Sequence, residues 1–135
     1  MNRKAILSTL WLFAIANYIY CDILSHMNPE FISVLAEGGQ FPDLPPIDEK
    51  FLLWAGLFME IPISMILLSR VLNYKANRIA NLIAGSIMTI AQIGTLFVGT
   101  PELHYIFFSI IEITTTAFIV VYVWKWHNTD CNSDT

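Results

Sequence analysis

Apolar residues along this chain are gathered into four long stretches with few interruptions. The stretches run from Ala5 to Leu24, Phe51 to Leu68, Ile79 to Val98 and Leu103 to Trp124. Each has about the 17–25 residues that a helix needs to cross the hydrocarbon core of a bilayer. The pattern therefore predicts an all-α fold, a four-helix transmembrane bundle whose spans cover about residues 5–25, 51–69, 79–98 and 103–125.

Composition supports a membrane domain. Hydrophobic residues make up 56% of the chain and charged residues 13%, and this charged share is about half the usual value for a soluble domain. A soluble fold of this length could not hide four such segments in one core, so we expect a single integral membrane domain over residues 1–135, with a disordered tail at 128–135. The two cysteines do not indicate redox chemistry, because Cys21 and Cys131 are predicted on opposite sides of the membrane and no CxxC motif occurs.

Basic residues are distributed unevenly between the two ends of the predicted spans. Six of the seven Lys and Arg residues flank the same ends, and these are Arg3, Lys4, Arg70, Lys75, Arg78 and Lys125. Only Lys50 falls on the other side. The positive-inside rule therefore predicts a multi-pass protein of the cell membrane with both termini cytoplasmic. The net charge of −4 comes mostly from the opposite, outer side, and no nucleic-acid partner is expected.

The long outer connection, from His26 to Lys50, contains a second kind of signal. Asn28-Pro29-Glu30 is typical of a helix start, with an N-cap residue, a proline in the first turn and an acid that faces the helix dipole. We predict a short amphipathic helix over Pro29–Glu37 that lies on or over the outer mouth of the bundle. The alternative is that this loop is a passive connector.

Polar residues within the predicted spans recur at helical spacing, so they fall on one face of each helix. The polar faces carry Tyr18 and Asp22 in the first span, Glu60 and Ser64 in the second, Asn81, Gln92 and Thr95 in the third, and Tyr105, Ser109, Glu112 and Thr116 in the fourth. If these faces turn inward, they line a funnel that opens to the outside. Glu60 and Glu112 each lie about nine residues from the outer end of their span, roughly 14 Å deep, so the funnel is predicted to narrow to these two carboxyl groups.

The chemistry of such a funnel follows from its charges. Because no Lys or Arg lies inside any predicted span, two close carboxyl groups could not both stay ionised without a cation. At least one of Glu60 and Glu112 is then protonated, or the pair holds a cationic ligand. The alternative is that protonated Glu and Gln side chains only join neighbouring helices. His26 and His104 could approach the acids, but no metal-ligand spacing such as HExxH is present, and no metal site is predicted.

Several short motifs carry a resemblance to known proteins. These are Asn17-Tyr18-Ile19-Tyr20 with Asp22, Met59-Glu60-Ile61-Pro62, Ser69-Arg70-Val71-Leu72 with Asn77-Arg78, and Glu112 followed by Trp124-Lys125-Trp126. In these motifs the chain is similar to a family of small four-span prokaryotic membrane proteins of unknown function. It has a looser likeness to DoxX-like four-helix proteins and to the sterol-binding fold of the emopamil-binding and sigma-2-receptor type. In the latter type, acids within the membrane line a ligand cavity, and no residue role is transferred from either group.

These observations favour a non-enzymatic membrane protein that binds a small amphipathic or cationic ligand, or a proton, in an outward-opening cavity. The expected ligand-binding residues are Asp22, Glu60, Gln92, Glu112, Tyr18, Tyr105, Ser64 and Ser109. Two alternatives stay open: a membrane enzyme or redox accessory subunit that acts on a lipid or quinone, and a structural subunit of a larger membrane complex. No cofactor or catalytic residue is indicated. The expected partners are the bilayer and a small hydrophobic or cationic ligand, and a homodimer is a further option because four spans are too few to enclose a wide pore.

Overall fold

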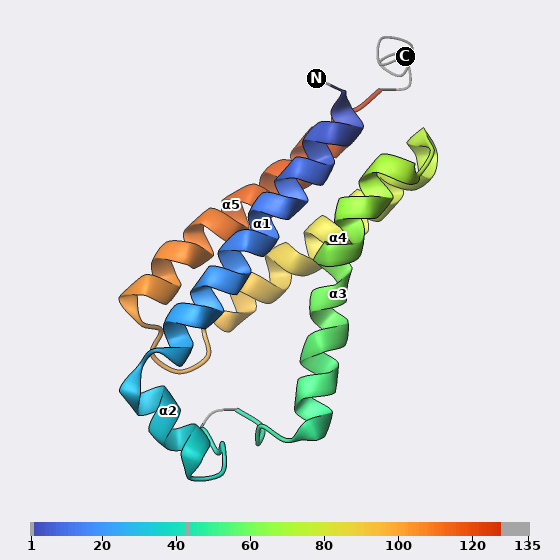
Figure 1. Cartoon of the computed structure of the whole chain (residues 1–135). Coiled ribbons are helices and arrows are strands. Elements are labelled where there is room, and N and C mark those ends of the chain that lie inside the picture. Colours follow the sequence, from blue (N-terminus) through green and yellow to red (C-terminus); the bar gives the residue numbers. More distant parts are fainter. Residues whose placement is uncertain (1, 43, 128–135) are drawn as a thin grey trace.

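The computed structural model describes residues 2–42 and 44–127, and this part of the chain is built from five helices without a β-strand (Figure 1). The helices are α1 (Arg3–His26), α2 (Pro29–Ala36), α3 (Glu49–Val71), α4 (Tyr74–Thr95) and α5 (Leu103–Trp124). The predicted all-α fold is confirmed, and so is the short helix in the first long loop. The predicted disordered tail, residues 128–135, and Cys131 within it lie outside the described residues.

Most of these helices begin at a side chain that caps them. The side-chain oxygens of Asn2, Asn28, Asp48 and Asn73 accept hydrogen bonds from the backbone N–H groups of Lys4, Glu30, Phe51 and Ala76. Each cap satisfies one of the N–H groups that a helix start leaves without a partner. Helix α5 is the exception, because the side chain of its N-cap residue, Glu102, makes no capping bond.

The N-cap at Asn73 moves the start of α4 away from its predicted position. The third span was expected at 79–98, whereas α4 runs over Tyr74–Thr95. The polar residues Lys75, Asn77 and Arg78 interrupt the apolar pattern, which favoured a loop. They instead form the first turns of the helix, and the connection from α3 is shorter than expected.

Helix α1 lies at the centre of the arrangement, with α5 along one side and the second half of α3 along another (Figure 1). Helices α4 and α5 form a close antiparallel pair near Gly85, where an added Cβ atom would lie 2.8 Å from Cγ2 of Val120. The core between these helices contains Leu7, Trp11, Ala14, Met65, Met88, Ile119 and Val123. The N-terminus and the end of α5 lie at the same end of the bundle, which we call the terminal end (Figure 1). Helix α2 lies at the opposite end, which we call the α2 end.

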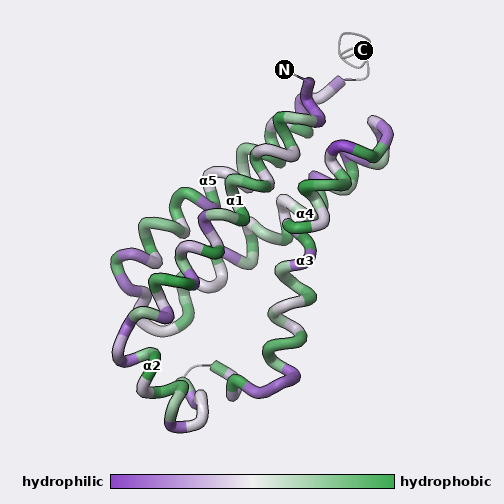
Figure 2. The backbone as a smooth tube through the Cα atoms, in the orientation of Figure 1, coloured by the Kyte–Doolittle hydropathy of each residue, from purple (hydrophilic) through white to green (hydrophobic). Residues whose placement is uncertain are grey.

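Helices α1, α3 and α5 are long and apolar enough to cross a membrane. Apolar residues run along the helices, and hydrophilic residues lie mostly towards the two ends (Figure 2). Helix α4 does not reach the same apolarity, because any 18 consecutive residues within it include Arg78 and Asn81. The structure is therefore consistent with a membrane protein, with three helices that qualify as spans where four were predicted.

Helix α3 is far less covered than its neighbours. Only 11% of its most apolar segment is buried, against 39% for α1 and 33% for α5. Its buried residues, Pro62, Met65 and Ser69, all lie in its second half. The first half diverges from the other helices towards the α2 end (Figure 1). Most of the apolar surface of α3 is thus left exposed within residues 2–42 and 44–127.

Candidate ligand-binding cavity

A cluster of polar side chains closes the terminal end of the bundle. Trp11 Nε1 donates to Asn81 Oδ1 over 2.7 Å, and Asn81 Nδ2 donates to Asn77 Oδ1 over 2.6 Å. Asn77 Nδ2 in turn donates to the carbonyl oxygen of Ser69 over 2.6 Å. All four residues, which we call the inner polar cluster, are 0% exposed. Because buried amide groups are costly unless they are hydrogen-bonded, this cluster ties α1, α3 and α4 together.

A cavity of about 170 Å³ lies further along the bundle, between α1, α3, α4 and α5. Its walls are Tyr18, Cys21 and Asp22 of α1, Phe58 and Met59 of α3, Met88, Ala91, Gln92 and Thr95 of α4, and Tyr105 and Glu112 of α5. We call it the acidic cavity. The structure thus brings together five of the eight predicted site residues.

Glu112 is the most deeply buried acid of the acidic cavity, at 1% exposure. Its Oε1 atom has no hydrogen-bond partner among residues 2–42 and 44–127. The hydroxyl of Tyr18, which is 6% exposed, likewise has no partner within this described part. A buried polar group without a partner costs about 1–3 kcal/mol, and more if it is charged. Both groups lie in the wall of the acidic cavity.

The other predicted polar residues hold or line the same cavity. Gln92 Nε2 donates to Ser109 Oγ over 2.9 Å, so Ser109, which is fully buried, positions the Gln92 amide from behind. Tyr105 is half-buried, and Asp22 is exposed at the end of the cavity nearer α2. Six predicted residues therefore belong to this site, with Ser109 as a support.

Glu60 and Ser64 do not belong to the acidic cavity, and this corrects the prediction that the funnel narrows to Glu60 and Glu112. Glu60 is exposed, and its carboxylate accepts a hydrogen bond from Ser64 Oγ over 3.3 Å. Helix α3 contacts the bundle through Pro62, Met65 and Ser69. At about 100° per residue, Glu60 is rotated roughly 200° from Pro62 and so points away from the bundle. Glu60 and Glu112 lie at equal depth in their predicted spans, but only Glu112 faces the acidic cavity.

A larger chamber of about 300 Å³ adjoins the acidic cavity at the α2 end. It is mostly apolar, and its walls are Ser25, Phe31, Leu44, Thr95, Val98, Pro101, Glu102, His104 and Tyr105. We call it the outer chamber. Thr95 and Tyr105 line both spaces, so the two lie on either side of these side chains.

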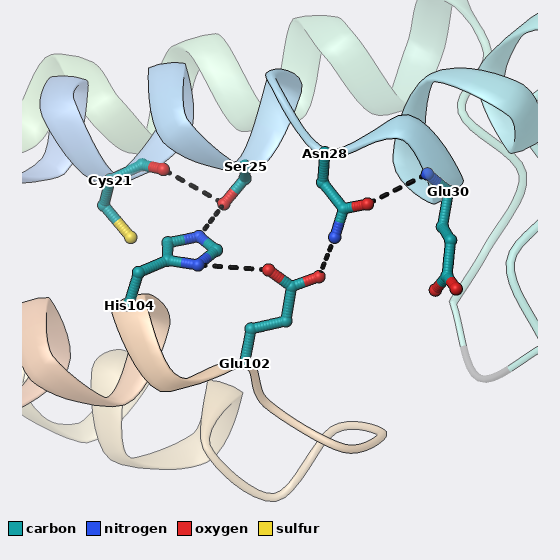
Figure 3. A network of polar contacts seen from close by, with 6 residues as sticks. All are labelled: Cys21, Ser25, Asn28, Glu30, Glu102 and His104. Carbon is teal, nitrogen blue, oxygen red and sulfur yellow. Dashed lines mark hydrogen bonds and ion pairs between the residues drawn. The ribbon is translucent and has the colours of Figure 1, made fainter.

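A chain of polar contacts joins α1, α2 and α5 around the outer chamber (Figure 3). His104 Nδ1 lies 3.0 Å from Glu102 Oε2, and His104 Nε2 lies 3.2 Å from Ser25 Oγ. Asn28 Nδ2 donates to the other oxygen of Glu102, while Asn28 Oδ1 caps α2 through the N–H of Glu30. The Glu102 side chain is thus engaged across the rim instead of capping α5.

Sequence reasoning missed several residues of the site. Cys21 follows Tyr18 by three residues, so helical spacing placed it on the lining face, but it was considered only as a disulfide candidate. Phe58 and Met59 gave no polar signal at all. Within residues 2–42 and 44–127, no group of three or more His, Cys, Asp or Glu side chains is arranged to hold a metal ion.

These features describe an all-α protein with three helices apolar enough to span a membrane and a cavity that contains unpaired polar groups. The chain belongs to a family of unknown function, DUF6326, which matches residues 1–133. This agrees with the expected membership of an uncharacterised family. No curated protein and no solved structure matched the chain.

Proposed function

We propose that this protein is a four-span membrane protein that binds a small amphipathic cation in the acidic cavity and the outer chamber. In this arrangement α4 is the fourth span, both termini are cytoplasmic, and the α2 end faces outside. The basic residues at the terminal end, such as Arg70, Lys75 and Arg78, support this orientation through the positive-inside rule. The antiparallel packing of α4 on α5 supports α4 as a span, since α5 qualifies as one.

The unpaired Oε1 atom of Glu112 is the observation that carries the proposal. A carboxyl group at this depth either carries a proton or faces a cation, because no Lys or Arg lines the acidic cavity. An ammonium group would donate hydrogen bonds to Glu112 and to Asp22, and the Tyr18 hydroxyl can accept a third. The acidic cavity thereby suits a compact cationic head group.

The outer chamber defines the other half of the ligand. Its walls contain Phe31, Leu44 and Val98, which favour an apolar group. Because Thr95 and Tyr105 line both spaces, a molecule with a charged head and a short apolar tail would fill them together. The looser likeness to sterol-binding four-span proteins agrees with an apolar tail but stays a prediction. The enzyme and structural-subunit alternatives likewise stay predictions.

A thermal-shift experiment on protein in lipid nanodiscs tests the proposal. The probes are short n-alkylammonium ions, with n-alkanols of the same chain length as neutral controls. We expect the ammonium series to raise the melting temperature of the wild type more than the alkanols do. Glu112→Gln should remove this difference, because the amide keeps the shape but cannot supply a negative charge.

Glu60→Gln is the matched control, since it changes a carboxyl group in the same membrane region but outside the cavity. It should keep the full response to the ammonium probes. Equal responses of wild type and Glu112→Gln would exclude Glu112 from the site and would overturn the proposal.

A further inference from the structure

Glu60 occupies an unusual place for an acid. It lies at the midpoint of α3, a helix that is apolar and long enough to span a membrane, and its side chain is exposed. Its contact with Ser64 Oγ stays within the same helix and leaves the carboxyl group on the outer surface. Under the membrane placement proposed above, this group would face lipid near the middle of the bilayer.

Such a position is costly for an isolated carboxyl group, above all if it is ionised. Ionisable residues within membrane spans almost always face protein or water, and they often pair with one another. Glu60 cannot turn inward, because the opposite face of α3 is buried through Pro62, Met65 and Ser69. Nothing in the described part of the chain covers it, so a protein partner would shield it from lipid.

The residues around Glu60 form a seam that is suited to another helix. Leu53, Glu60 and Leu67 follow one another at intervals of seven residues, and Gly56 and Ile63 lie three residues after the first two. This is the a/d spacing of a helix pair with a left-handed crossing. Leu53, Ile63 and Leu67 are 62%, 44% and 65% exposed. Nothing lies within 4 Å of the place where a Cβ atom on Gly56 would be, so a second backbone can approach there.

We infer that the α3 seam, defined as Leu53, Gly56, Glu60, Ile63 and Leu67, is a homodimer interface with a second copy of this chain. The inference takes only the membrane placement from the proposed function and not the ligand. A two-fold axis along the membrane normal sets the two α3 helices parallel, so each Glu60 meets the other at the same depth. A carboxyl group both donates and accepts when it is protonated, and the Ser64 hydroxyl does the same, so the seam is complementary to itself.

A second copy fits the seam better than a basic partner does. The rest of the seam is apolar and contains no acid to pair with a basic partner, and a leucine lies seven residues before Glu60 and another seven residues after it. A helix of another protein would need a matching spacing and a polar group at the depth of Glu60. In a second copy of this chain, the two-fold axis brings the same residues to the same depth. The cavity and the core face away from the seam, so dimerisation leaves both intact.

Disulfide cross-linking in native membranes tests the inference. Single cysteines are placed at Leu53, Leu67 or Trp54 in a background in which Cys21 and Cys131 are replaced by serine. Trp54 is as exposed as the two leucines, at 71%, but lies roughly 120° around the helix from Glu60. We expect Leu53→Cys and Leu67→Cys to form cross-linked dimers on mild oxidation, and Trp54→Cys to form few.

Two further substitutions should weaken the seam by removing different interactions. Glu60→Leu removes the polar pair, and Gly56→Leu blocks the close approach of the two backbones. Each should reduce the dimer association constant on the order of tenfold, measured by fluorescence energy transfer in lipid vesicles. Trp54→Leu is the matched control and should leave the constant unchanged. Because α3 exposes all these positions, the ammonium response of the cavity should persist in each variant, which separates this inference from the proposed function.

Cross-linking that is equal at Leu53, Leu67 and Trp54 would overturn the inference. An unchanged association constant in both Glu60→Leu and Gly56→Leu would do the same. If these substitutions instead release a different co-purifying protein while the chain stays monomeric, the seam has another occupant and the homodimer is wrong.

Discussion

The inner polar cluster and the acidic cavity treat buried polar groups in opposite ways, while Trp126 Nε1, just after the end of α5, belongs to neither and has no partner within the described residues. At the terminal end, Trp11, Asn77 and Asn81 are fully buried and connected by short hydrogen bonds. Towards the α2 end, Tyr18 and Glu112 are nearly as buried, yet the Tyr18 hydroxyl and Glu112 Oε1 have no partner within the described residues. The terminal end is therefore closed by its own side chains, whereas the other end holds a cavity of about 170 Å³.

Under the proposed function, this difference separates polar residues that hold the fold from those that bind a ligand. A satisfied buried amide adds specificity to helix packing, and its removal leaves its partners without hydrogen bonds. An unpaired carboxyl group adds nothing to packing, so a fold would keep it only at a cost. The contrast predicts that mutations at the two ends have very different effects on stability.

Asn81→Leu should have the largest effect. It leaves Trp11 Nε1 and Asn77 Oδ1 buried without partners, so we expect a loss of about 2–4 kcal/mol in the free energy of unfolding. Reversible unfolding in mixed micelles measures this loss. Ser64→Ala, at a half-buried position of α3 whose hydroxyl contacts Glu60 of the same helix, is the control and should change the free energy little. A loss no larger than that of the control would remove the structural role of the inner polar cluster.

Gly85→Ala should have an intermediate effect, because it tests the close contact between α4 and α5. The added methyl group would lie 2.8 Å from Val120 Cγ2 and 3.4 Å from the carbonyl oxygen of Thr116. Overpacking of this kind costs about 1–3 kcal/mol. Val120→Ala in the same protein should recover most of the loss. Gly94→Ala, where nothing lies within 4 Å of the added atom, should show none of it.

Glu112→Gln should have the smallest effect when no ligand is present. The substitution changes an oxygen that has no partner in the described structure, so the free energy of unfolding should stay within about 1 kcal/mol of the wild type. The same micelle assay measures it. A loss as large as that of Asn81→Leu would show that Glu112 holds the helices together, and the contrast between the two ends would disappear.

The helices could be predicted from sequence because each apolar run is long enough to dominate its local pattern. The start of α4 could not be predicted, because Lys75, Asn77 and Arg78 make the sequence before Ile79 polar. The helix nevertheless begins at Tyr74, where Asn73 caps it. In the cavity, Asp22 and Glu112 were found because their stripes coincide with the packed faces of α1 and α5. Glu60 was misplaced because spacing gives the depth of a residue but not the direction in which its helix is turned.

The chain of contacts around the outer chamber has a consequence for how fast a ligand could exchange. It joins α1, α2 and α5 through half-exposed groups such as His104 and Glu102, and exposed ion pairs contribute only about 0.2–1 kcal/mol each. Breaking the contacts of this rim therefore costs less free energy than breaking the hydrogen bonds of the inner polar cluster would. Under the proposed function, a ligand should enter and leave through the α2 end. The lifetime of the bound molecule should then depend on how often the Asn28–Glu102 and Ser25–His104 contacts break.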